Sequence, residues 1–182
     1  LVGSEMCIRD SDVRHRYSSV QGTAEFSMNG TFSVRFQPGA WAKEHERSYE
    51  DASQSCLERI DFQGTLISSE SGERPGQTVL TYYQNWEGTP LFSCQVTLLW
   101  QDDTLLRMEG QRLSGTITSS SEEETLSAAT VLVRFLAGVT EGGFVCSRID
   151  EMNAGYLIVS GTTRPVELTP CLLYTSPSPR DR

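Results

Sequence analysis

The sequence predicts an α+β fold in which antiparallel β-sheet meanders are each packed by one helix. Two stretches, Thr23–Phe36 and Gln77–Glu109, alternate apolar and polar residues with the period of a half-buried strand. Two capping-box patterns, which begin at Ser48 and Ser121, each precede apolar residues at helical spacing. Hydrophobic residues make up 37% of the chain and charged residues 21%, which is typical of one soluble globular domain or two small ones.

The first alternating stretch predicts a β-hairpin around an Asn-Gly pair. A two-residue turn at that pair would mix the apolar and polar faces. A three-residue loop that ends at Gly30 instead pairs Phe26 with Phe32 and Ala24 with Val34, so that one face is apolar throughout. We therefore expect the three-residue loop, with Gly30 in the left-handed conformation.

The Ser48 capping box predicts a short amphipathic helix. Its apolar face consists of Tyr49, Ala52, Cys56, Leu57 and Ile60. A strand is expected over Asp61–Ile67. The Ser-Gly and Pro-Gly pairs within Ser68–Gly76 then predict a surface loop.

The second alternating stretch predicts an antiparallel meander. Strand Thr78–Trp86 is followed by strand Phe92–Trp100, and a turn at Asp102-Asp103 leads to a third strand, Thr104–Glu109. The register that gathers the large apolar side chains on one face pairs Trp86 with Phe92, Tyr82 with Val96, and Leu80 with Leu98. In this register Tyr83 faces away from the predicted core.

The Ser121–Glu124 capping box predicts a second helix, which is apolar around most of its girth as far as Leu136 and is expected to be buried. Gly138 is its expected end. Short strands are predicted over Phe144–Ile149, Gly155–Ser160 and Val166–Thr169. The helix–strand order after Ser48 and again after Ser121 suggests a repeated α+β module, with the second copy cut short.

Both ends of the chain look like translated cloning or sequencing DNA. Codons that encode Cys171–Asp181 have a reverse complement that encodes Leu1–Asp10, and this DNA resembles the transposase adapter used to fragment sequencing libraries. We therefore interpret Leu1–Ser11 and Cys171–Arg182 as adapter artefacts and expect them to pack poorly. The segment Asp12–Pro170 is then an internal piece of a longer gene.

The formal net charge of −9 argues against a nucleic-acid backbone as partner. His15 and His45 are the two histidines, and His45 lies in a charged connection where a solvated role is expected. The chain contains no nucleophile elbow, zinc-protease motif or phosphate-binding loop. Asp102-Asp103 is ordinary turn chemistry. The sequence therefore predicts no enzyme, no cofactor and no metal site.

Three cysteines lie between the two adapter-like ends, namely Cys56, Cys94 and Cys146. Without a C-x-x-C spacing they make a poor zinc or redox motif, so they are expected to be small buried apolar residues. A disulfide between Cys94 and Cys146 is the alternative in an oxidising compartment.

Four short motifs resemble those of a known family. They are the tyrosine-glutamine strand with its Gly-x-Pro corner at Tyr83–Phe92, the glycine-arginine-leucine ending at Glu109–Leu113, the helix at Ser127–Leu136, and the pair Gly155-Tyr156. Together they resemble PepSY-type domains and are more closely similar to the YycI/YycH-type regulatory proteins of Gram-positive bacteria.

The alternation assigns an N-terminal hairpin to 12–37, and the resemblance implies a first PepSY-like module at 38–118 and a truncated second module at 119–170. It implies a non-enzymatic domain on the extracytoplasmic side of the cell membrane, attached through an N-terminal anchor absent from this fragment. The implied partner is a protein, either a WalK-type sensor histidine kinase of a two-component system or a paralogous regulator, with no nucleic acid involved. Tyr83 is the candidate partner-binding residue.

Two alternatives stay open. A general PepSY-like module of this kind could inhibit a peptidase or serve envelope or spore assembly. An enzyme whose active site lies outside the fragment is the other alternative. An adjoining peptidase domain in the same gene would favour the first of these over a kinase regulator.

Overall fold

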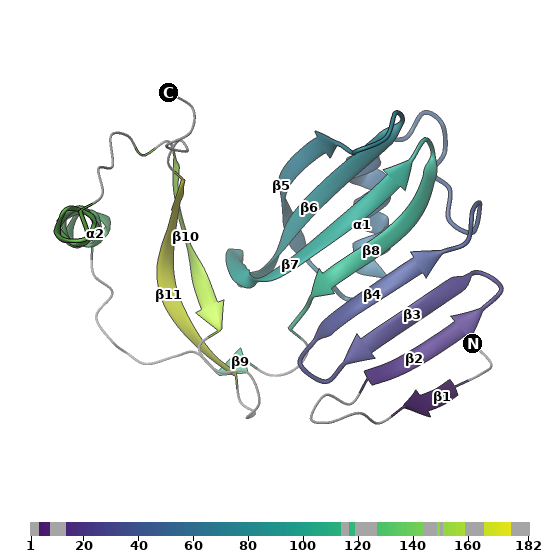
Figure 1. Cartoon of the computed structure of the whole chain (residues 1–182), viewed down its shortest axis with the longest axis horizontal. Coiled ribbons are helices and arrows are strands. Elements are labelled where there is room, and N and C mark those ends of the chain that lie inside the picture. The colour runs from purple at the N-terminus through teal and green to yellow at the C-terminus, as the bar shows by residue number, and fades with distance from the viewer. Residues whose placement is uncertain are drawn as a thin grey trace.

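The computed structural model describes residues 4–7, 14–113, 117–118, 127–143, 149, 151–158 and 166–175. Within these ranges two helices and eleven strands form an α+β fold with one large, mostly antiparallel sheet (Figure 1). The strand order is β1-β2-β3-β4-β8-β7-β10-β11-β9, with β6 paired to β7 and β5 paired to β6. The predicted fold class is confirmed at the level of α+β.

The N-terminal hairpin has the predicted register. Strands β3 (Gly22–Ser27) and β4 (Thr31–Phe36) pair Phe26 with Phe32 and Ala24 with Val34, and Gly30 has φ +88°. The hairpin is widened by β2 (Arg14–Ser19), which the polar sequence did not predict, and its other edge pairs with β8.

Helix α1 (Tyr49–Glu58) begins where the capping box predicts. The Ser48 hydroxyl accepts a hydrogen bond from the Asp51 amide at 3.0 Å. Ala52, Cys56 and Leu57 are buried against the sheet, and the main core gathers beneath them. The core residues contributed by the sheet include Leu80, Tyr82, Val96, Leu98, Trp100, Leu105 and Met108.

The meander consists of β5 (Gly64–Ser71), β6 (Gln77–Trp86), β7 (Thr89–Gln101) and β8 (Thr104–Gln111). Tyr82 pairs with Val96 and Leu80 with Leu98, as predicted. The predicted pair Trp86–Phe92 is wrong, because a register shift after Tyr83 pairs Trp86 with Thr89. The loop predicted over Ser68–Gly76 is also wrong in part, since β5 continues to Ser71 as a polar edge strand.

The second helix differs from its prediction. Helix α2 (Ala128–Glu141) is capped by Ser127, and it continues through Gly138 to a C-cap at Gly142. Residues 121–124 lie outside the described part of the chain. The expected burial is wrong for two of its apolar side chains, since Val133 is 67% exposed and Leu136 is 39% exposed.

Strands β10 (Glu151–Ile158) and β11 (Val166–Thr175) form an antiparallel hairpin, and β9 (Ile117–Thr118) pairs with β11 in parallel. The hairpin joins the rest of the sheet through a parallel bridge between Tyr156 and Leu91 of β7. Residues 144–148, most of one predicted strand, lie outside the described ranges.

Two parts of the adapter-like ends are paired with the sheet. Strand β1 (Ser4–Cys7) lies antiparallel to β2, and β11 runs through Cys171 to Thr175 in register with β10. Both segments therefore have backbone partners in the sheet, and the expectation that the ends contribute nothing to stability stays a prediction. Backbone pairing needs no particular side chains, so an open strand edge accepts such a sequence.

The cysteines Cys56 and Cys94 are buried free thiols. Burial raises the pKa of Cys56 to about 12 and that of Cys94 to about 11, so both are protonated and unreactive at neutral pH. The prediction of buried apolar cysteines is confirmed for these two. Cys146, the alternative partner of Cys94, lies outside the described residues.

Candidate functional site

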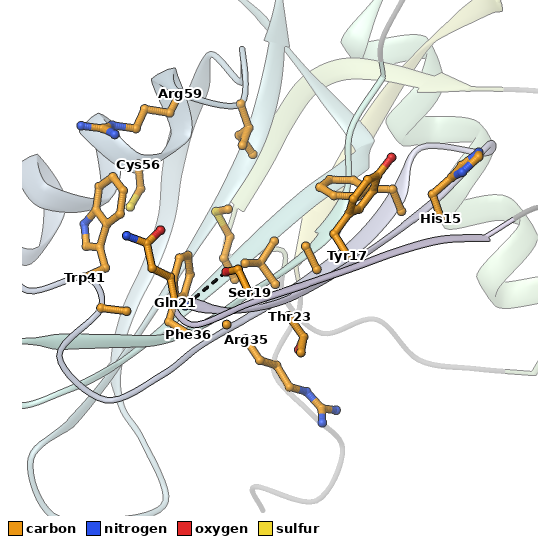
Figure 2. A pocket seen from close by; sticks show the side chains of 17 residues that line it. His15, Tyr17, Ser19, Gln21, Thr23, Arg35, Phe36, Trp41, Cys56 and Arg59 are labelled. Carbon is orange, nitrogen blue, oxygen red and sulfur yellow. Dashed lines mark hydrogen bonds between the residues drawn. The ribbon is translucent and has the colours of Figure 1, made fainter. Parts of the chain in front are cut away.

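The sheet is wider than the single helix that packs on its apolar side. A helix is about 10 Å across and neighbouring strands are about 4.8 Å apart, so one helix covers roughly two strands. The apolar side of β2, β3 and β4 is therefore left open beside the C-terminal end of α1. A groove of about 560 Å³ lies there (Figure 2).

The floor of this groove follows from the strand register. Cross-strand pairs place His15 opposite Phe26 and Tyr17 opposite Ala24, so all four side chains share one face of the sheet. The wall opposite these strands is made by Trp41, from the connection before α1, together with Cys56 and Ile60. The lining includes four half-buried aromatic side chains, those of Tyr17, Phe26, Phe36 and Trp41.

The charge of the groove differs from that of the chain as a whole. The chain has 24 acidic residues, yet none of the described aspartates and glutamates lines the groove, whereas His15 and Arg59 do. The Arg59 guanidinium lies 4.6 Å from the centre of the Trp41 ring, a cation–π arrangement that orients it. Figure 2 shows Arg59 and Trp41 at one end and His15 at the other, with the Arg35 side chain pointing away.

The predicted partner-binding residue Tyr83 lies on the other face of the sheet. Its neighbour Tyr82 is buried in the main core, so Tyr83 points away from α1. The Tyr83 ring meets Phe92 edge-on, with 5.3 Å between the ring centres. Tyr83 and the groove are therefore two separate features on opposite faces.

The tyrosine-glutamine motif has a clear structural role. Where β7 shifts register, the side-chain amide of Gln84 pairs with the backbone of Leu113 as a neighbouring strand would. Gln84 Nε2 donates to the Leu113 carbonyl at 3.0 Å, and the Leu113 amide donates to Gln84 Oε1 at 2.7 Å. Two of the motifs that carry the resemblance are thus joined by one side chain.

Replacement of Gln84 by leucine is expected to lower the free energy of unfolding by about 1–3 kcal/mol, because the part-buried amide and carbonyl of Leu113 lose their partners. Urea denaturation followed by circular dichroism would measure the loss. Gln95→Leu, at an exposed position of β7, is the matched control and should change stability by no more than about 0.5 kcal/mol. Equal effects of the two variants would contradict this role for Gln84.

The remaining candidates from the sequence, His45 and Asp103, interact with each other and with Lys43 at the turn between β7 and β8. Lys43 lies 2.8 Å from Asp103, and the exposed His45 ring lies 3.2 Å from the same carboxylate. Hydrogen bonds from Lys43 and His45 hold the pKa of Asp103 below its usual range. Among the residues that the structure describes, no group of three or more histidine, cysteine or acidic side chains is placed to hold a metal ion.

Sequence reasoning missed the groove residues Tyr17, Trp41 and Arg59. The alternation of His15, Tyr17 and Ser19 is the one local signal for β2, and it is weak because only one of the three is large and apolar. Trp41 and Arg59 come from a connection and a helix end, and only the tertiary fold brings them to the hairpin.

Comparison with protein-family models, curated proteins and solved structures finds no match for this chain. Neither of the two described helices is long and apolar enough to cross a membrane.

Proposed function

We propose that this chain is an extracytoplasmic domain of a YycI/YycH-type regulator, which acts without catalysis by binding a protein partner. The proposed partner is a membrane sensor histidine kinase or a paralogous regulator. The observation that carries the proposal is the Tyr83–Phe92 pair, two half-buried aromatic side chains in edge-to-face contact on the sheet face opposite α1.

The surroundings of this pair have the composition of a small interface. Val79 and Leu99 pair across β6 and β7 on the same face, and both are half-buried. The ion pair Arg107–Glu109, at 3.2 Å, borders them on β8. An apolar, partly aromatic centre with a charged border is the usual arrangement of a protein-binding surface.

The net charge of the chain favours a protein over other partners. At −9, the domain repels both the nucleic-acid backbone and anionic lipid headgroups. A basic surface on the partner would accelerate association, and this contribution would weaken as salt is added.

The test uses the full-length, membrane-anchored protein, purified from membranes with and without Tyr83→Ala. We expect a sensor kinase to co-purify with the unmodified protein and its recovery to fall roughly tenfold or more with Tyr83→Ala, the effect of losing a central aromatic contact. Tyr17→Ala is the matched control, since Tyr17 is a half-buried tyrosine on the opposite face of the sheet.

Two outcomes would count against the proposal in different ways. If no membrane protein is recovered above background, the regulatory function is wrong. If the kinase is recovered equally with all three proteins, the function stands and the Tyr83 surface is wrong. Recovery of a peptidase in place of a kinase would favour the alternative of a peptidase-inhibiting module.

A further inference from the structure

We infer that the groove between α1 and strands β2–β4 binds a single-chain aliphatic carboxylate of the fatty-acid type. The acyl tail would lie along the apolar floor, and the carboxylate would lie at the Arg59 end. This site is separate from the Tyr83 surface, and the two proposals can fail independently.

The size and lining of the groove fit a small amphiphile. Its volume of about 560 Å³ falls within the range of roughly 300–1,000 Å³ typical of small-molecule sites. Phe26, Val34, Ile60 and Met108 supply apolar surface along it. Each methylene group buried there would add to the affinity.

An acyl chain fits this floor better than an extended peptide. The groove lies on a face of the sheet, where the backbone groups of β2, β3 and β4 are already paired in the ladders. A peptide laid across that face would bury its own amide and carbonyl groups without partners, which costs free energy. An acyl chain has no polar groups along its length and avoids that cost.

The polar groups of the groove favour a negatively charged head. The guanidinium of Arg59 is held over the Trp41 ring, and no carboxylate of the described chain lies within ion-pair distance of it. The Gln21 side chain lies at the same end (Figure 2). A guanidinium can donate two parallel hydrogen bonds to one carboxylate, and an amide is a further donor at this end.

The experiment titrates the whole chain with dodecanoate below its micellar concentration and measures heat and tryptophan emission, since Trp41 lies in the groove. Dodecan-1-ol and dodecyltrimethylammonium serve as neutral and cationic probes with the same tail. We expect saturable binding of one dodecanoate, weaker binding of the alcohol and the weakest binding of the cation.

Two variants test the two parts of the site separately, the carboxylate contact and the apolar floor. Arg59→Gln should weaken dodecanoate binding about tenfold and leave dodecan-1-ol unchanged, because it removes only the charge-assisted contact. Arg35→Gln is the matched control, since Arg35 borders the groove but points away from it, and it should change neither affinity. Ala24→Leu fills part of the floor and should weaken both ligands.

The absence of saturable binding by dodecanoate would overturn the inference. Equal affinity of all three probes, or an Arg59→Gln variant that binds dodecanoate like the unmodified chain, would also overturn it. Circular dichroism of Ala24→Leu would show whether weaker binding comes from a filled groove or from a damaged fold. Arg59 is exposed, so Arg59→Gln should fold normally and tests the site whatever the result for Ala24→Leu.

Discussion

Replacement of Gly110 by alanine is expected to cost about 3–5 kcal/mol of the free energy of unfolding. Gly110 has φ +154°, which L side chains rarely adopt. An added Cβ would lie 2.0 Å from the Gln95 carbonyl oxygen and 2.8 Å from the Val96 Cα. Both contacts are with the backbone of β7, so relief would require the β7–β8 ladder to separate. Urea denaturation of the whole chain would measure the loss.

Gly39→Ala is the control for this prediction. Gly39 also has a positive φ, +79°, but no atom lies within 4 Å of the position of its Cβ. This variant should therefore lose only the cost of the left-handed conformation, about 1–2 kcal/mol. If the two alanine variants lose equal stability, the close approach of β7 and β8 at Gly110 is not what requires glycine there.

Trp100→Ala is the second large effect, with an expected loss of about 3–5 kcal/mol. The Trp100 side chain is fully buried beneath α1, and its ring lies edge-on to Tyr49 with 5.8 Å between the ring centres. Truncation would leave a cavity at the centre of the main core. Trp86→Ala is the control, because Trp86 is only partly buried and packs at the edge of the smaller core. A loss as large at Trp86 as at Trp100 would contradict the prediction.

A double-mutant cycle separates the polar contact of Trp100 from its packing. Trp100 Nε1 donates a buried hydrogen bond to Ser53 Oγ at 2.9 Å, which joins the sheet to α1. Ser53→Ala alone would leave the indole N–H without a partner, at a cost of about 1–3 kcal/mol. Combined with Trp100→Phe, the same change should cost less than the sum of the two single changes. Strict additivity would show that the hydrogen bond contributes nothing.

The features that the sequence predicted well depend on local signals. The register of the first hairpin follows from alternation on both sides of a short loop, and the start of α1 follows from one capping serine, Ser48. Both involve residues close together in the chain, so a few side chains suffice to specify them. The predicted pairs Tyr82–Val96 and Leu80–Leu98 were right because alternation gathers their large apolar side chains on one face of the sheet.

The predictions that were wrong concern places where tertiary contacts outweigh a local sequence pattern. The register shift after Tyr83 is accommodated by the Gln84–Leu113 contact, which joins residues 29 positions apart. The interior Gly138 does not end α2, because a single glycine costs a helix only about 1 kcal/mol. Alternation along the strand is enough to place Tyr83 on the face opposite the core. The groove could not be predicted in this way, because its residues come from β2, a connection and the end of α1.

Strand β7 pairs with both β8 and β10, and this arrangement affects the cooperativity of unfolding. One edge of this strand pairs with β8 along its C-terminal half and meets β10 at a single bridge near its start. Among the residues that the structure describes, twelve buried side chains form the core on the β8 side, whereas three, Leu91, Cys94 and Leu168, form the core beside β10. The β10–β11 hairpin can therefore detach while the rest of the sheet stays folded. The chain should behave as two foldons of unequal stability, and amide hydrogens in β10 would exchange with solvent well before those in β6.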